Sequence, residues 1–209
     1  MAIRVPRLSY EDLRGAADRF LAQHGATDVV PVPIEEIVEF RMGINIIPLP
    51  GLHVGHEIDG FLSADMTEIS VDLHVFESRP ARYRFTLAHE VAHTILHGDA
   101  LKAVAPASIP DWKKFVRELT EPDREWLEWQ AYAFAGLVLA PRTPLARAYR
   151  EAIRMADEAG FDLERNLDVA RQYMATAIGK VFEASASVIE KRLVYDGIWE
   201  GGKDRGRNS

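Results

Sequence analysis

Three histidines and a glutamate lie close together in residues 85–99, whose sequence is FTLAHEVAHTILHGD. His89, Glu90 and His93 form an H-E-x-x-H motif, and His97 follows four residues after the second histidine. Residues four apart on a helix share one face, with Cβ atoms about 5–6 Å apart, so two such histidines can bind one metal ion. Glu90 lies one position round the helix, where its carboxylate reaches a metal-bound water. Because zinc lowers the pKa of that water to about 7, the motif predicts a hydrolytic site with Glu90 as general base.

A second interpretation makes His89 and His93 hydrogen-bonded core histidines and Glu90 a surface residue. We favour the metal site, because the other positions of the segment are apolar and predict a mostly buried helix, in which imidazoles need partners. His97 has two interpretations of its own. It either extends the row of ligands or, as we favour, it stabilises the end of the helix or supports a ligand from behind.

A catalytic zinc ion needs a third protein ligand and an open position. The chain has no cysteine, and no histidine follows at the spacing H-E-x-x-H-x-x-G-x-x-H, so we look for the ligand among the downstream acids. These are Asp99, Asp111, Glu118, Glu121, Asp123, Glu125 and Glu128. Glu128 shares a helix face with small and apolar residues, which let two helices approach closely. The spacing alone leaves open whether Glu128 meets the histidines or stabilises the start of its own helix. Tyr132, one turn later, either donates a hydrogen bond to the reacting oxygen or packs between helices.

The elements that position these residues are mainly helices. Hydrophobic spacing and capping residues predict helices at 9–25, 32–43 and 78–98, a helix within 111–141 that ends by Pro141, and further helices in 144–160 and 167–199. Three short strands are predicted at 44–51, 58–65 and 68–75, and an irregular segment at 99–110. The fold class is therefore α+β, with a small antiparallel or mixed sheet of about three strands and a helical body. We expect a core at residues 1–141, a helical C-terminal subdomain packed on it at 142–198, and a disordered tail at 199–209.

Composition limits the other classes of function. The chain has 209 residues, of which 47% are hydrophobic and 27% charged, as is typical of a soluble globular protein. Its net charge of −7 gives no general attraction to nucleic-acid phosphates. The arginines after Pro141 alternate with acidic residues, which indicates a solvated helical surface. Since the sequence has neither a signal peptide nor an apolar run of about 20 residues, we expect a cytoplasmic protein without a membrane segment.

Two segments together resemble the ImmA/IrrE family of metallopeptidases. They are RYRFTLAHEVAHTILHG and EWQAYAFAGLVLAP, which fit R-F-T-x-A-H-E-x-x-H-x-x-L-H and E-x-x-A-x-x-F-A-x-x-x-L-x-P. The matching residues are Arg84, Phe85, Thr86, Ala88, His89, Glu90, His93, Leu96, His97, Glu128, Ala131, Phe134, Ala135, Leu139 and Pro141. The resemblance covers residues 8–141, and it departs at Ala140, where the family often has methionine. It implies a gluzincin-like (zincin) fold and a zinc ion held by His89, His93 and Glu128. Another divalent cation also suits such ligands.

The resemblance also implies a role in gene regulation, because members of the family act beside helix-turn-helix repressors. We therefore expect a zinc-dependent endopeptidase that cleaves or inactivates a partner repressor, in an anti-repressor, toxin–antitoxin-like or stress-response role. The alternative is a binding module without catalysis, which sequesters the repressor and has a structural metal site.

A third hypothesis is direct DNA binding through the C-terminal helices, whose EASAS segment resembles a winged-helix recognition turn. We favour two packed helices there and expect no direct nucleic-acid binding, because only Lys180, Lys191 and Arg192 are basic. The residues expected to form their packing are Val181, Phe182, Val188, Ile189 and Leu193.

Overall fold

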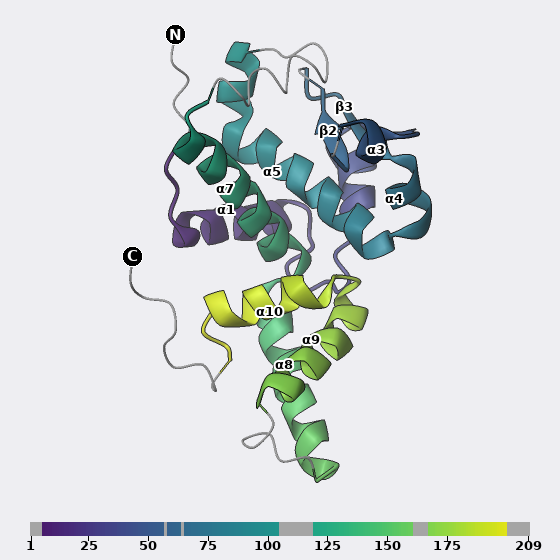
Figure 1. The fold of residues 1–209 in the computed structure, drawn as a ribbon. Helices are drawn as coiled ribbons and strands as arrows, with labels where there is room; N and C mark the ends of the chain where they lie inside the picture. The colour runs from purple at the N-terminus through teal and green to yellow at the C-terminus, as the bar shows by residue number, and fades with distance from the viewer. Residues whose placement is uncertain (1–5, 57, 64, 105–118, 161–166, 200–209) are drawn as a thin grey trace.

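The computed structural model describes residues 6–56, 58–63, 65–104, 119–160 and 167–199 (Figure 1). The helices before the sheet are α1 (Tyr10–Gln23) and α2 (Ile34–Glu36), and α2 continues into a π-helical turn, η1 (Ile37–Arg41). The strands are β1 (Asn45–Leu49), β2 (Gly60–Leu62) and β3 (Glu68–Asp72), with α3 (Leu52–His56) between the first two. After the sheet come α4 (Leu73–Ser78), α5 (Pro80–Val104), α7 (Glu121–Leu139), α8 (Arg142–Glu158), α9 (Leu167–Phe182) and α10 (Ala186–Tyr195).

The sheet has three strands in the order β1-β3-β2. β1 is parallel to β3, and β2 is antiparallel to it, so the sheet is mixed and β2 forms one edge. Together with the predominance of helix, this confirms the predicted α+β class. The predicted strand at 68–75 is wrong beyond Asp72. Its carboxylate accepts hydrogen bonds from the backbone N–H groups of His74 and Val75, which begins α4 at Leu73.

The helix that bears the H-E-x-x-H motif begins at Pro80, close to the predicted start, but it does not end at Gly98. It continues to Val104, so the irregular segment predicted from residue 99 is wrong as far as 104, and its remainder lies outside the described residues. A glycine inside a helix costs only about 1 kcal/mol relative to alanine. Leu101 is buried in the main hydrophobic cluster, and this burial favours continuation of the helix beyond the glycine.

The motif helix packs between the sheet and α7, which lies beside it in Figure 1. Where α5 meets α7, both helices have alanines with no exposed surface, so the two backbones approach closely. These alanines are Ala88, Ala92, Ala131 and Ala135. α1 packs on the other side of α7, where the Phe20 and Phe134 rings meet edge to face at 6.0 Å. The small-residue stripe predicted for α7 is therefore confirmed as a helix-packing face.

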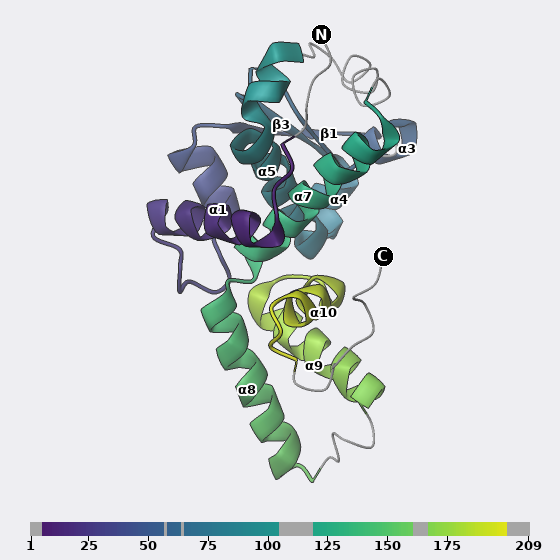
Figure 2. The same ribbon diagram turned by 90° about the vertical axis from the view of Figure 1, so that its left-hand side faces the viewer.

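The last three helices form a second unit of packing, which Figures 1 and 2 show below the sheet and the motif helix. One hydrophobic cluster gathers residues from Leu13 to Leu139, and another gathers residues from Ala140 to Trp199. The predicted division into parts 1–141 and 142–198 stays a prediction. Trp199, which the sequence placed in the tail, is buried with its ring 5.4 Å from that of Tyr149. The rest of the predicted tail lies outside the described residues.

α9 and α10 are joined by a tight turn. A Cβ atom on Gly179 would lie 2.7 Å from the carbonyl oxygen of Ala184, so only glycine allows this approach. Ser185 caps α10 by accepting a hydrogen bond from the Val188 backbone N–H. Four of the five predicted packing residues lie in or against the second cluster, whereas Val181 is 58% exposed, which is a correction.

Candidate metal centre

Three of the predicted ligands meet where α5 and α7 touch. His89 and His93 lie one turn apart on α5, with their Nε2 atoms 3.1 Å from each other. Glu128 comes from the second turn of α7, and its Oε2 is 3.3 Å from the Nε2 of His89. One ligand atom from each of the three residues lies within 4.8 Å of the others. Two nitrogen ligands of a tetrahedral zinc ion stand about 3.4 Å apart, so this donor set fits the ion.

The other acids predicted as possible third ligands do not join this cluster. Asp99, Glu121 and Glu125 are exposed, and Asp123 forms an ion pair with Arg7 at 2.7 Å. Asp111 and Glu118 lie outside the described residues. In the part of the chain that the structure describes, Glu128 is therefore the acid that the fold brings to the two histidines.

His97 lies behind His93 and not among the three. Its Nδ1 is 3.0 Å from the Nδ1 of His93, and its side chain is 1% exposed. Because α5 continues past Gly98, the suggestion that His97 stabilises a helix end is wrong. Its position instead suits a residue that orients the ring of His93 while the Nε2 atom of His93 faces the cluster.

Glu90 is 7% exposed and lies between α5 and the edge strand β2, so its interpretation as a surface residue is wrong. A Cβ atom on Gly60 of β2 would lie 3.2 Å from the Oε1 of Glu90 and 2.4 Å from the Cγ2 of Thr86. The absence of a side chain at Gly60 therefore lets the strand lie against the carboxylate. Sequence reasoning missed this role of Gly60, although an isolated glycine within a strand is a known sign of close approach.

The same burial shapes the acid–base properties of Glu90. Burial raises the pKa of Glu90 to about 7, and the charge of Glu128 adds to this rise, while His89 and the Leu62 backbone lower it. A carboxylate with a pKa near neutrality can both accept and return a proton at physiological pH.

The ligand side chains are held in different protonation states. Burial lowers the pKa of His93 well below its usual value and that of His97 to about 4, so both are neutral at pH 7. Burial also lowers the pKa of His89, but its hydrogen bond with Glu128 and the two nearby carboxylates outweigh this, and the net shift is upward. Burial raises the pKa of Glu128, but the hydrogen bond with His89 and the nearby histidines bring it down to about 2. The cluster thus offers the carboxylate of Glu128 and the neutral imidazole of His93 in the forms that bind metal, whereas His89 would give up the proton that Glu128 favours there when an ion binds.

Tyr132 lies beside the cluster, one turn after Glu128. Its ring is 4.8 Å from that of His89 and is stacked on Phe85 at 5.5 Å. It is 54% exposed, so its outer side faces solvent. Both predicted roles remain open to it, because the ring packs between α5 and α7 while the side chain borders the metal centre.

A small sheet, a helix with H-E-x-x-H and a second helix with the glutamate together make up a metallopeptidase-like fold. Residues 72–194 match the peptidase M78 model, described as the IrrE N-terminal-like domain, and the chain belongs to this family. The resemblance to ImmA/IrrE metallopeptidases is thereby confirmed. The matched region begins later than the residues that indicated the resemblance, and it continues through most of α10.

Comparisons with individual proteins add little to this assignment. No curated protein matches the chain. Among solved structures, a Mycobacterium tuberculosis transcriptional regulator is similar with a TM-score of 0.48 and 18% identity, over 85% of this chain and 45% of its own. The present chain thus spans less than half the length of that protein. No helix within the described ranges has the length and apolar character needed to cross a membrane.

Proposed function

We propose that this protein is a zinc-dependent endopeptidase. The observation that carries the proposal is the meeting of His89, His93 and Glu128 within 4.8 Å, on two helices of a member of a metallopeptidase family. Glu90, next to the first histidine and buried beside the cluster, supplies the proton-accepting group that hydrolysis needs.

Each residue has a separate role in this mechanism. His89, His93 and Glu128 would hold the ion, and His97 would orient His93 from behind. When bound there, zinc would polarise a peptide carbonyl and lower the pKa of a water molecule, so that this water could lose a proton and attack. Glu90 accepts the proton of the attacking water and passes it to the departing amine. Tyr132 would either pack between the two helices or donate a hydrogen bond to the carbonyl oxygen as negative charge develops on it. Manganese or another divalent cation would suit the same ligands.

The substrate in this proposal is a cytoplasmic partner, a helix-turn-helix repressor that cleavage inactivates. Its support is the family, whose members act beside such repressors. We assign the chemistry to residues 1–141 and packing on that core to residues 142–198.

The alternative function is sequestration of the repressor without catalysis, with the metal as a structural element. Direct DNA binding is the third candidate function, and in it α10 would be the recognition helix. Arg192 of α10 is buried and donates hydrogen bonds to the Ala140 carbonyl oxygen at 3.0 and 3.2 Å. This burial removes one of the few cations of α10 from any contact with phosphate, which argues against the third candidate.

The first test is the metal content of the purified protein, measured by elemental mass spectrometry. We expect about one zinc ion per chain in the wild type and none in Glu128→Ala. Glu125→Ala is the matched control, because Glu125 lies one turn earlier on the same helix and is exposed. Zinc that survives Glu128→Ala, or is missing from the wild type after zinc is supplied, would contradict the proposed site.

The second test separates catalysis from sequestration. Glu90→Gln keeps the size of the side chain but removes its basicity, so we expect bound zinc and repressor binding to remain while cleavage is lost. Loss of repressor cleavage in an assay with purified components, together with loss of derepression in cells, supports the peptidase. Derepression by the Glu90→Gln variant would show that sequestration is sufficient.

A further inference from the structure

A pocket of about 390 Å³ opens beside the metal centre, between the motif helix, α7 and the C-terminal helix α10. We call it the aromatic pocket, because rings line it on both sides. One wall comes from α5 and α7, and the other from α1 and α10. Its main lining residues are Phe85, Trp129, Tyr132, Tyr10, Val188 and Tyr195. Its volume lies within the range of about 300–1,000 Å³ typical of small-molecule sites.

Two residues that line the aromatic pocket also lie against His89 of the metal centre. Tyr132 lines the pocket and has its ring 4.8 Å from that of His89. Phe85 also lines it, with its ring 6.4 Å from His89 and stacked on Tyr132. An extended peptide advances about 3.3–3.5 Å per residue. One or two residues of such a peptide span about 3–7 Å, which is the scale of the ring contacts that join the pocket lining to His89.

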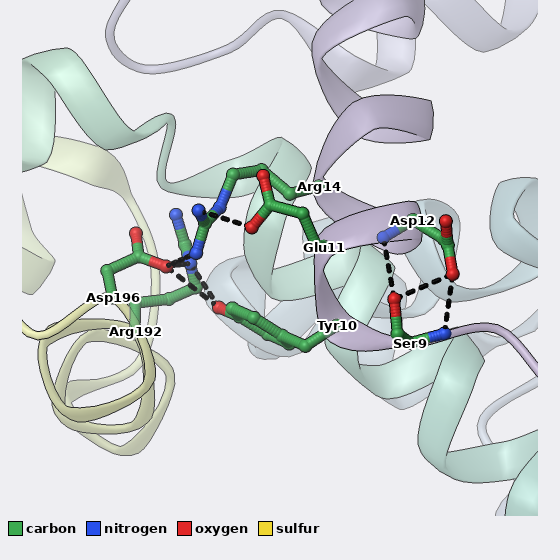
Figure 3. A network of polar contacts seen from close by, with 7 residues as sticks. All are labelled: Ser9, Tyr10, Glu11, Asp12, Arg14, Arg192 and Asp196. Atoms are coloured by element: carbon green, nitrogen blue, oxygen red, sulfur yellow. Dashed lines mark hydrogen bonds and ion pairs between the residues drawn. The ribbon is translucent and has the colours of Figure 1, made fainter.

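The wall formed by α1 and α10 is held in place by a buried polar network, drawn in Figure 3. The Asp196 carboxylate accepts hydrogen bonds from Arg192 at 2.7 Å, from Tyr10 at 3.1 Å and from Arg14 at 3.2 Å. Arg192 also donates to the Tyr10 hydroxyl. Through the Ala140 carbonyl, the same guanidinium fastens α10 to the end of α7. Because Tyr10 and Arg192 line the pocket as well, the network gives the cavity a fixed shape.

Polar groups of α10 and of its N-cap residue reach the cavity as well. Ser185, Ser187 and Lys191 belong to its lining and are exposed. The pocket therefore combines ring-lined walls with exposed polar groups, an arrangement suited to an apolar side chain whose backbone stays near the surface.

We propose that the aromatic pocket binds a large apolar side chain of the peptide substrate, one or two residues from the bond that is cleaved. The inference rests on the proposed peptidase function and adds a specificity-determining site to it. It also gives the C-terminal helix a direct part in substrate recognition, because α10 supplies one of the walls.

The test uses peptide hydroxamates, which bind zinc and are not cleaved. Two pairs are needed, one with the variable residue before the zinc-binding group and one with it after. Each pair compares alanine with phenylalanine, and calorimetry measures the dissociation constants on the zinc-loaded protein. In at least one pair we expect the phenylalanine compound to bind about tenfold or more tightly, because a whole ring is removed from water.

Two variants fill the pocket from α10 without touching the metal ligands, Ser187→Phe and Lys191→Phe. In both variants the dissociation constants of the phenylalanine and alanine compounds should become nearly equal, and the dissociation constants of the alanine compounds should not change. Ala177→Phe is the matched control, since Ala177 is exposed on α9 and lies outside the pocket. Equal binding within both pairs, or a preference that persists in both filled variants, would overturn the inference.

The design distinguishes this failure from failure of the proposed function. If no hydroxamate binds, the zinc peptidase proposal fails. The pocket is then tested separately with N-acetyl-phenylalanine amide, a compound that has the apolar ring but no zinc-binding group. Nuclear Overhauser contacts between that ring and the indole of Trp129, lost in Ser187→Phe, would keep the pocket as a site for apolar side chains. Their absence in the wild type would overturn it.

Discussion

Two clusters of polar side chains are buried at helix contacts in this molecule, and they differ in how their members face each other. The histidine cluster consists of His89, His93, His97 and Glu128. The arginine network consists of Tyr10, Arg14, Arg192 and Asp196. In the network, cations and a hydroxyl surround one carboxylate oxygen. In the histidine cluster, ring nitrogens of the same kind face each other at 3.0 and 3.1 Å.

The difference follows from what each group can donate and accept. A guanidinium donates at all its nitrogens, so Arg192 is matched to a carboxylate, a carbonyl and a hydroxyl. A neutral imidazole has one donor nitrogen and one acceptor nitrogen. When three imidazoles are bonded in a row, the outer nitrogen of the first ring and that of the last ring are left to find partners elsewhere. The Nδ1 of His89 and the Nε2 of His97 are buried and have no hydrogen-bond partner among the described residues. The network also has two buried atoms without a partner among the described residues, Arg14 Nε and Asp196 Oδ2, but there opposite charges face each other. Paired opposite charges suit a structural role, whereas ring nitrogens that face each other suit a cation.

The largest expected effect is the loss of metal when a histidine of the cluster is replaced. His93→Ala removes one ligand and its link to His97, so we expect the bound zinc to fall from about one ion per chain to none. Added zinc should raise the melting temperature of the wild type and leave that of the variant unchanged. Calorimetry with and without a chelator measures this. A melting temperature of the variant that still rises with zinc would mean that the ion binds elsewhere.

The complementary experiment is in the arginine network. Arg192→Met keeps most of the apolar length of the side chain but leaves Asp196 buried with fewer partners. Breaking a buried ion pair from one side costs about 3–5 kcal/mol, so denaturant unfolding should show a loss of stability of that order. Zinc content should remain at the wild-type value, because none of the ligands is touched. If Arg192→Met lost zinc without losing stability, the two clusters would not have the separate roles we assign.

The sequence predicts the metal centre better than it predicts the surroundings of that centre. His89, Glu90 and His93 are close because they lie within one turn of a helix, which spacing alone reveals. The face of Glu128 is also readable, because Ala131 and Ala135 share it and are buried against α5. Local spacing therefore indicates His89 and His93 as ligands, whereas for Glu128 it indicates only the helix face, and the resemblance to the family supplies the rest.

The rest depends on contacts between distant parts of the chain. Arg192 reads as a basic surface residue, yet it is 3% exposed and bonded to Tyr10, 182 positions earlier. The aromatic pocket combines residues from both ends of the chain and has no local signal. The end of α5 was misjudged because Gly98 gives a stop signal that the burial of Leu101 overrides. In each case tertiary packing decided the result.

Replacement of His97 should weaken zinc binding less than replacement of His93 does. The comparison tests whether His97 supports a ligand or is a ligand itself. His97→Phe retains a ring of similar size but removes the nitrogen that faces His93. Loss of such a supporting partner typically weakens metal binding by 10- to 100-fold, in contrast to the complete loss expected for His93→Ala. Competition with a chromogenic chelator measures the zinc affinity. An affinity equal to that of the wild type would mean that His97 only fills space, and complete loss would make it a ligand.

The smallest effect concerns the response of the arginine network to alkaline pH. Burial raises the pKa of Tyr10 to about 12 from a usual value near 10; Arg192 opposes the rise and Asp196 adds to it. The folded protein thus holds this proton more tightly than the unfolded chain does. The contribution to stability is complete below pH 10 and is lost as the pH rises towards 12. The Tyr10→Phe variant has no such proton, so its stability should fall less over this range, with a cost of about 1 kcal/mol at neutral pH. Denaturant midpoints at pH 8, 10 and 11 measure how steeply the stability of the wild type and of Tyr10→Phe falls with pH. Tyr173→Phe is the control, because Tyr173 is exposed on α9. Parallel slopes for the wild type and Tyr10→Phe would mean that the hydroxyl is not held by the network in solution.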